Sequence, residues 1–204
     1  MFVVTIDQRS SRVVGDRVPE LLGLLGPGFV AGGAARDEGV RLGIERTVGD
    51  EVQAVLDDPA LVVGLAMRVL RIGGWSIGIG AGPVDEPLPT STREGSGPAF
   101  ILARTAVEAA KSRQRSVPLA VRGYDDTAGR DAEAVLVLAA AVAARRSAQG
   151  WEVVDALADD DRQEDVASRL GISQQAVSKR LRASLWPEEQ QAHRAAAHLL
   201  AAAQ

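Results

Sequence analysis

The sequence contains no cysteine and only two histidines, and aromatic side chains make up 3% of its 204 residues. Without cysteine, disulfides and thiolate metal sites are excluded, and His193 and His198 lack the i, i+4 spacing that helical zinc ligands prefer. Hydrophobic residues still make up 46% of the chain, so the core is expected to consist of Val, Leu, Ile and Ala. These proportions are typical of a globular protein.

A long apolar run is missing as well. The most hydrophobic stretch, residues 134–144, is far shorter than the roughly 20 residues that cross a bilayer as a helix. The first residues, MFVVTIDQRS, have neither the basic start nor the apolar run of a secretory signal. We therefore expect a cytoplasmic protein without a membrane partner. Because domains usually have about 100 to 200 residues, a medium-sized domain with a smaller one is expected.

Negative charge is absent from one segment of a chain whose net charge is −4. Residues 166–187 contain no Asp or Glu, whereas they contain four cationic side chains, Arg169, Lys179, Arg180 and Arg182. An acidic balance over the whole chain argues weakly against nonspecific binding of nucleic acid, but such an average hides a basic segment. The function of this segment therefore has to be inferred from its own sequence.

The stretch QEDVASRLGISQQAVSKRLR, residues 163–182, predicts two short helices separated by a turn. Val166, Ala167 and Leu170 give the first helix an apolar side. Gly171 follows directly, and glycine commonly ends helices because it readily adopts a positive φ. The first helix is therefore expected to stop at this glycine.

The second helix is predicted at residues 174–184. Ser173 supplies an N-cap hydroxyl, and Val177 and Leu181 form an apolar side with i, i+4 spacing. A further helix at residues 149–158 would complete a three-helix core. Two short helices joined by a Gly-containing turn of a few residues form a helix-turn-helix, the second helix of which enters the major groove of DNA.

The outward face of this second helix is polar. If its apolar residues point inward, helical geometry at about 3.6 residues per turn leaves the candidate DNA-binding residues on the other side. These are Ser173, Gln174, Gln175, Ser178, Lys179 and Arg182. Gln pairs well with adenine and Arg or Lys with guanine, and a hydroxyl at a helix N-terminus holds a phosphate. The alternative is a solvated helical hairpin whose basic face only aids solubility, although the missing acidic residues argue against it.

This segment resembles the helix-turn-helix of bacterial regulators. The matching positions are Ala167, Leu170, Gly171, Ser173, Val177 and Ser178. The resemblance implies double-stranded DNA as the partner of a small all-α unit, which we place at residues 149–204 because a helix is also expected after Trp186-Pro187. A linking helix at residues 129–148 is rich in Ala, Val and Leu on several faces, which indicates burial against the first domain or a partner subunit.

The preceding part, residues 1–128, alternates predicted strands and helices in the order of a ferredoxin-like domain. Strands are expected at residues 3–6, 40–48, 51–56, 75–81 and 117–121, and helices at residues 16–25, 59–71 and 98–111. The predicted fold class is therefore α+β, followed by the small all-α unit.

Two carboxylates are candidates for a metal site in this first domain. Asp7 ends the first predicted strand, and Asp50 follows Gly49 at the tip of a tight hairpin. If the strands are neighbours, the paired carboxylates can hold Mg²⁺ and leave positions for phosphate oxygens. The ordinary interpretation, a strand cap and a common Gly-Asp turn, stays open beside it.

The hairpin at residues 46–50, Arg-Thr-Val-Gly-Asp, resembles the Lys-Thr-x-Gly-Asp hairpin of class III nucleotide cyclases, and residues 75–84 resemble the Gly-rich strand that follows it there. The resemblance implies metal ligands and nucleotide contacts at four positions. These are Asp7 and Asp50 for the metal, and Arg46 and Arg104 for the nucleotide.

The match to the cyclases is incomplete. Phe100 stands where they have an asparagine, and a phenyl ring cannot donate the hydrogen bond of that amide. Arg46 replaces the lysine that reads the purine. The layout of the chain is closer to SatD-like proteins, which join a cyclase-like domain to a small helix-turn-helix. We assign no catalytic residue.

The sequence therefore predicts a dimeric, DNA-binding transcriptional regulator whose degenerate cyclase-like domain dimerises and senses a nucleotide. The resemblance to cyclases implies two-fold pairing, so a homodimer on a palindromic operator is expected. The alternative is an enzyme, either a Mg²⁺-dependent nucleotide cyclase or a nucleotide-binding signalling enzyme, with Asp7 and Asp50 as the metal ligands. No cofactor besides Mg²⁺ is indicated.

Overall fold

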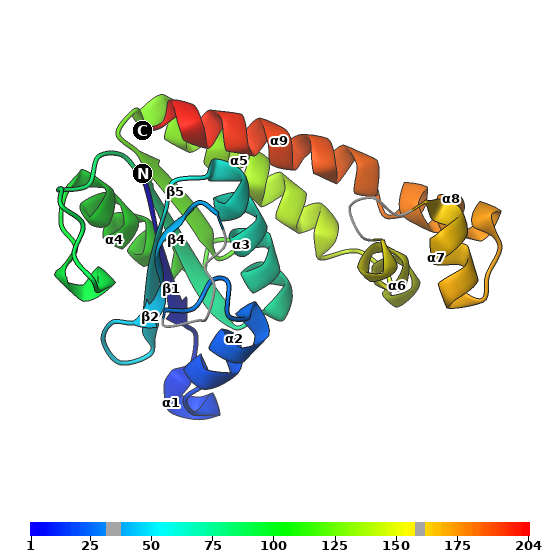
Figure 1. Cartoon of the computed structure of the whole chain (residues 1–204), viewed down its shortest axis with the longest axis horizontal. Helices are drawn as coiled ribbons and strands as arrows, with labels where there is room; N and C mark the ends of the chain where they lie inside the picture. The colour runs from blue at the N-terminus through cyan, green and yellow to red at the C-terminus, as the bar shows by residue number, and fades with distance from the viewer. Residues whose placement is uncertain (32–37, 158–161) are drawn as a thin grey trace.

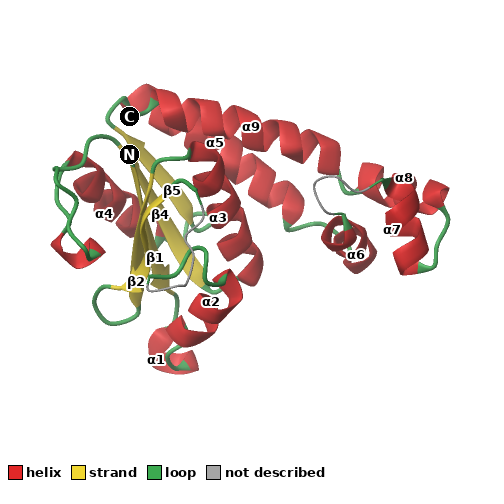
Figure 2. Ribbon diagram, in the orientation of Figure 1, coloured by secondary structure: helices red, strands yellow, loops and turns green. Residues whose placement is uncertain are grey.

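A computed structural model of the chain describes residues 1–31, 38–157 and 162–204, and its class is α+β (Figures 1 and 2). Its centre is a five-stranded mixed sheet with the order β2-β3-β1-β4-β5. The strands are β1 (Phe2–Gln8), β2 (Val40–Arg46), β3 (Glu51–Leu56), β4 (Trp75–Ala81) and β5 (Leu119–Gly123). The central strand β1 is antiparallel to both of its neighbours, whereas the edge strand β5 is parallel to β4.

The sequence located these strands to within two residues at their ends. The expected strand at residues 40–48 ends at Arg46, because Thr47 already belongs to the hairpin turn and its N–H donates to the carbonyl of Glu51 at 2.9 Å. The strand expected at residues 117–121 begins at Leu119, because Pro118 has no N–H to contribute to the ladder.

One face of the sheet is covered by α4 (Pro98–Ala110), which approaches β4 unusually closely (Figure 1). A Cβ atom on Gly78 would lie 2.2 Å from the backbone nitrogen of Val107, and one on Gly80 would lie 2.1 Å from the carbonyl oxygen of Ala99. The Gly-x-Gly pattern of β4 is thus explained by packing, since only glycine leaves room for a helix backbone at this distance.

The other face is covered by helices that contribute to the larger apolar core. These are α2 (Val18–Leu25), α3 (Pro59–Ile72), α5 (Asp126–Ala143) and the C-terminal part of α9 (Trp186–Ala202). A short helix, α1 (Ser11–Val14), and a 3₁₀ turn, η1 (Thr92–Glu94), complete this part. No helix in the described ranges is long and apolar enough to cross a membrane.

Three short helices form a second, separate core at one end of the molecule (Figure 1). They are α6 (Ala148–Ala156), α7 (Gln163–Leu170) and α8 (Gln174–Ala183). Their buried residues are Val153, Val154, Val166, Ala167, Val177 and Leu181. The helices expected at residues 163–171 and 174–184 are therefore present with the predicted apolar sides. The helix expected at residues 149–158 ends at Ala156, and its last expected residue lies outside the described part.

The helix α9 connects both cores. Trp186 at its start packs against the three short helices, whereas Leu200 near its end is fully buried in the sheet core. The carbonyl of Ala203 accepts a hydrogen bond from the N–H of Asp125 at 3.2 Å, next to the start of α5. In the sequence the three short helices lie between two long helices, α5 and α9, which run side by side (Figure 1).

Candidate functional site

The turn between α7 and α8 is closed by local hydrogen bonds. Gly171 adopts the left-handed conformation with φ 64° and ψ 32°, and the N–H of Ile172 donates to the carbonyl of Ala167 at 3.0 Å. The hydroxyl of Ser173 then accepts a hydrogen bond from the N–H of Ala176 at 3.2 Å, which caps the start of α8. The sequence predicted both the glycine stop and the serine cap.

The two sides of α8 differ sharply in exposure. Val177 and Leu181 are buried in the small core. The six candidate DNA-binding residues lie together on the other side and at the start of the helix, where all but the half-buried Ser178 are exposed. They are Ser173, Gln174, Gln175, Ser178, Lys179 and Arg182. The structure therefore brings these residues together on one surface that another molecule can reach.

The charge on this surface is not neutralised within the small unit. Arg180 points to its neighbour α6 and pairs with Glu152 at 2.6 Å. Lys179 and Arg182 have no carboxylate at ion-pair distance in the part of the chain that the structure describes, and Arg182 only donates a hydrogen bond to Ser178 at 3.3 Å. Two cationic side chains therefore remain available on the exposed side of α8.

A buried ion pair lies at the junction of the two cores. Arg146, just after α5, and Glu189 on α9 form an ion pair with side chains that are 0% and 3% exposed. The guanidinium carbon of Arg146 is 4.2 Å from the ring centroid of Trp151 and 5.3 Å from that of Trp186. The sequence pattern around Arg146 and Glu189 did not predict this ion pair, because more than forty positions separate the two residues.

A second ion pair ties the small unit to the sheet unit directly. Arg71, in the last turn of α3, pairs with Asp155 on α6 through two hydrogen bonds of 2.5 and 2.6 Å. Its guanidinium also lies over Trp151, 3.8 Å from the ring centroid. The indole of Trp151 is therefore stacked against two arginines, one in the last turn of α3 and one just after α5.

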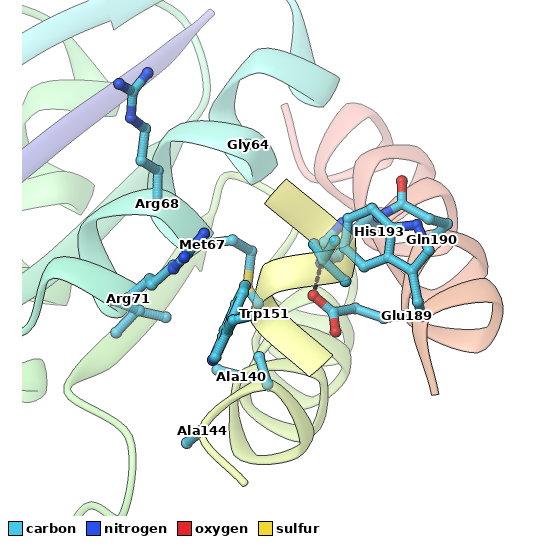
Figure 3. Close-up of a pocket in the computed structure, with 14 residues that line it drawn as sticks. Gly64, Met67, Arg68, Arg71, Ala140, Ala144, Trp151, Glu189, Gln190 and His193 are labelled. Carbon is cyan, nitrogen blue, oxygen red and sulfur yellow. Dashed lines mark ion pairs between the residues drawn. The ribbon is translucent and has the colours of Figure 1, made fainter. Parts of the chain in front are cut away.

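A cavity of about 610 Å³ opens at this junction between α3, α5, α6 and α9 (Figure 3). Figure 3 shows Met67 and Trp151 on one side of it and Glu189 and His193 on the other. Burial raises the pKa of Glu189 although Arg146 opposes the shift, and burial together with the charge of Arg146 lowers the pKa of His193. The fold therefore favours the neutral form of His193 more than an exposed position would.

The two candidate metal carboxylates lie at the same end of the sheet. The N–H of Gln8 donates to the carbonyl of Asp50 at 3.3 Å, which brings the hairpin tip beside the end of β1. However, the ammonium of Lys111, at the end of α4, lies 2.9 Å from the carboxylate of Asp7. Burial raises the pKa of Asp7, with Lys111 opposing it and the charges of Asp50 and Glu51 adding to it.

A lysine therefore lies beside the carboxylate at which the sequence predicted Mg²⁺. Within the described ranges, no cluster of three or more His, Cys, Asp or Glu residues has the arrangement of a metal site. The arrangement of Asp7 is that of a charge neutralised within the protein.

The two candidate nucleotide-binding arginines differ in their surroundings. Arg46 pairs with Asp16 at 2.7 Å and donates to the carbonyl of Gly49 at 3.1 Å, so Asp16 and the hairpin turn together hold it. Arg104 on α4 is 70% exposed, and its closest carboxylate, that of Glu51, is 4.0 Å away. The structure does not pair these arginines with a common partner.

Arg104 stands at a cleft of about 270 Å³ between the β2–β3 hairpin, η1 and α4. Thr5, Gln53 and Glu51 contribute its polar wall from the sheet, and Arg93 lines it from η1. The Phe100 ring also lines the cleft. It packs beneath Gly95, where a Cβ atom would lie 2.1 Å from it.

Comparisons of this chain with protein-family models, curated proteins and solved structures found no match.

Proposed function

We propose that this protein is a DNA-binding transcriptional regulator in which α8 enters the major groove. The observation that carries the proposal is the exposed polar side of α8. Gln175, Lys179 and Arg182 lie on the side opposite the buried Val177 and Leu181, and Gln174 is exposed at the start of the helix. Glutamine amides and cationic side chains on one rigid helix are the groups that read base edges and phosphates.

The arrangement of the small unit supports its assignment as a helix-turn-helix. The segment from Gly171 to Ser173 forms the turn, Ile172 packs against the small core, and α6 supplies the third helix. The N-cap hydrogen bond of Ser173 leaves the first N–H groups of α8 directed outward, where a phosphate of the DNA backbone would be accommodated.

The sheet order supports the ferredoxin-like, cyclase-like interpretation of the larger unit. Strands β1 to β4 form an antiparallel sheet ordered β2-β3-β1-β4, and helices follow β1 and β3 in sequence. In this proposal the larger unit acts as a scaffold and regulatory part. Catalysis is not proposed, because Lys111 neutralises Asp7 and Phe100 stands at the position of the cyclase asparagine.

A nucleotide is the proposed ligand of the larger unit, with Arg104 as its phosphate contact. The supporting observation is that this guanidinium is largely exposed at the mouth of a polar cleft and only loosely paired. Calorimetric titration with ATP and GTP, with and without Mg²⁺, tests this part. Heat of binding that is lost in Arg104→Ala supports it, and no heat with any nucleotide overturns it.

The DNA-binding part is tested by selecting genomic DNA fragments with the purified full chain and measuring mobility shifts. Replacing Gln174 or Arg182 by Ala should weaken binding to the selected site by about 1 to 3 kcal/mol per lost bidentate contact. Arg12→Ala is the matched control, because it removes one exposed positive charge at the far end of the sheet unit. If both α8 variants bind as tightly as the unchanged chain, the proposal is wrong.

A further inference from the structure

The outer side of α5 is an apolar stripe that the described chain covers only in part. Leu138 stands at its centre and is 68% exposed, and Ala134, Val135, Ala141 and Val142 surround it with exposed or half-exposed side chains. At about 100° per residue, all of these positions lie within roughly 60° of Leu138 around the helix. Such a stripe in the middle of a long helix indicates a contact surface.

The stripe ends in two opposite charges at equal distances from its centre. Asp131 is seven residues before Leu138, and Arg145 is seven residues after it. The α-helix ends at Ala143, and the turn that follows it keeps the chain coiled as far as Arg145, whose N–H donates to the carbonyl of Val142 at 3.0 Å. Seven residues are close to two helical turns, so both charges lie on the same side of α5 as Leu138.

Asp131 and Arg145 differ from the other charged residues of α5 and the turn that follows it, which form ion pairs within the chain. Arg130 pairs with Asp126 at 2.5 Å, and Glu133 pairs with Arg115 and Arg122 at 2.6 and 2.9 Å. For the other two ionic side chains, Asp131 and Arg145, the described part of the chain offers no ion-pair partner. The helix therefore presents one acidic and one basic group that another molecule can neutralise.

A hollow in the stripe has the form that receives a side chain from a neighbouring helix. It has a volume of about 220 Å³ and lies between α5 and α9. On α5 its lining residues are Val135, Leu138, Ala139 and Val142, which have the i, i+3, i+4, i+7 spacing. The remaining lining residues come from α9 and the residue before it: Leu185, Glu188, Glu189 and Ala192. The four α5 residues have the spacing of the hole that accepts one knob in helix pairs of the coiled-coil type.

We propose that α5 pairs with α5 of a second copy of this chain, antiparallel, about a two-fold axis at Leu138. In this register Leu138 meets Leu138 of the partner subunit, and each leucine fills the hollow of the other helix. Asp131 meets Arg145 of the partner subunit, and the symmetry repeats this ion pair at the other end. Ala134 meets Val142 of the partner subunit, and the small alanine permits the close approach of the two helices.

The charges of Asp131 and Arg145 favour the antiparallel orientation of the two copies of α5. A parallel pair would place each Asp131 beside its equivalent and each Arg145 beside its equivalent, and like charges at such distances are destabilising. The positions of both charges are symmetric about the centre of the apolar stripe. An isologous contact, in which one surface meets itself, requires this symmetry, whereas a different partner protein would not.

This inference specifies a contact for the homodimer that the sequence predicts, but it depends only on α5 and does not require DNA binding. The contact is formed by the helix that precedes the three short helices, so the pairing would also relate the two copies of α8 by a two-fold axis. A palindromic operator requires that relation.

Sedimentation equilibrium of the full chain and of charge variants provides the first test. The unchanged chain should be a dimer, and Leu138→Asp should raise the dimer dissociation constant by about a hundredfold or more, because two charges would be placed at the axis. Ile101→Asp is the matched control, since Ile101 is 69% exposed on α4, away from this surface. Circular dichroism checks that each variant is folded.

The orientation is tested by exchanging the charges. Asp131→Arg alone and Arg145→Asp alone should each raise the dissociation constant by about tenfold, because each creates two like-charge contacts. The double variant, Asp131→Arg with Arg145→Asp, restores both ion pairs and should recover dimerisation. A double variant no better than the single ones would overturn the antiparallel register.

Cross-linking supplies an independent readout, because the chain contains no cysteine. Oxidised Leu138→Cys should form a disulfide-linked dimer, and Ile101→Cys should not. A chain that remains monomeric, or a dimer unaffected by Leu138→Asp, would overturn the inference. Mobility shifts with the same variants separate the two proposals: a dimer through α5 that binds no DNA would refute only the proposed function, and DNA binding by a monomer would refute only this contact.

Discussion

Arg146 and Glu189 form an ion pair that is closed off from solvent at the junction between the sheet unit and the three short helices. Arg146 follows α5, Glu189 lies in the first turn of α9, and the indoles of Trp151 and Trp186 lie against the guanidinium. The guanidinium also donates a hydrogen bond to the carbonyl of Ser184 at 3.3 Å. The buried guanidinium of Arg146 therefore joins the segment that leads into the small unit, after α5, to the segment that leads out of it, at the start of α9.

Removing the carboxylate of this pair should be strongly destabilising. In Glu189→Ala the buried guanidinium keeps its charge without a counter-ion, and breaking a buried pair in this way costs about 3 to 5 kcal/mol. Urea denaturation followed by circular dichroism measures the change in the free energy of unfolding. The neighbouring exposed Glu188 is the control, and Glu188→Ala should change stability by less than about 0.5 kcal/mol. Equal losses in both variants would contradict the central role of the pair.

The pH dependence of stability should contain a contribution from His193. Burial and the charge of Arg146 lower its pKa, and its Nε2 is 3.5 Å from the carboxylate of Glu189. Because the folded protein favours the neutral imidazole, this contribution is fully present above the pKa of an unfolded histidine, about 6.5. As the pH falls below that value, the unfolded chain binds a proton that the folded protein resists, so the free energy of unfolding decreases.

The measurement compares the free energy of unfolding of His193→Gln with that of the unchanged chain between about pH 7 and pH 5. The decrease should be smaller in the variant, whereas His198→Gln, at an exposed position of the same helix, should follow the unchanged chain. Burial raises the pKa of Glu189, so protonation of that carboxyl acts in the opposite direction at the acid end. Identical pH profiles for His193→Gln and the unchanged chain would show that the imidazole is not held neutral.

The close contact of α4 with β4 predicts that adding a single methyl group to β4 destabilises the protein. In Gly80→Ala the new Cβ would lie 2.1 Å from the carbonyl oxygen of Ala99, so the helix has to move, at a cost of about 1 to 3 kcal/mol or more. Gly64→Ala on α3 is the matched control, because nothing lies within 4 Å of its Cβ position. That change should stabilise the protein by up to about 1 kcal/mol, since alanine is the better helix former. Thermal denaturation of both variants should therefore give shifts of opposite sign.

Features set by neighbouring residues were predicted well from the sequence. The glycine stop at Gly171, the cap at Ser173 and the apolar side formed by Val177 and Leu181 depend only on local backbone geometry, and all are present. The Gly-x-Gly pattern of β4 was also noticed, but its reason, the close approach of α4, depends on tertiary packing.

Features that depend on distant residues were not predicted. The tail helix was assigned to the small unit, and its alanines gave no indication that Leu200 packs in the sheet core beside α5. Lys111 was not recognised as the partner of Asp7, because 104 positions separate them and only the packing of α4 on the sheet brings them together. An amphipathic pattern shows that a helix has a buried side without showing what covers it.

The pairing of Lys111 with Asp7 leads to a prediction about metal binding. Removing this ammonium would leave the carboxylate of Asp7, on which the charges of Asp50 and Glu51 act, without its counter-ion. Divalent cations bind to groups of carboxylate oxygens, so Lys111→Ala should bind Mg²⁺ or Mn²⁺ more tightly than the unchanged chain, by about tenfold. Isothermal titration calorimetry with each metal measures this change.

In a double variant that also carries Asp7→Asn the gain in metal affinity should disappear, whereas a gain that persists would place the metal elsewhere. If Lys111→Ala binds neither metal better than the unchanged chain, the lysine does not occupy the place of a cation, and the carboxylates at this end of the sheet are the ordinary cap and turn that their positions also permit.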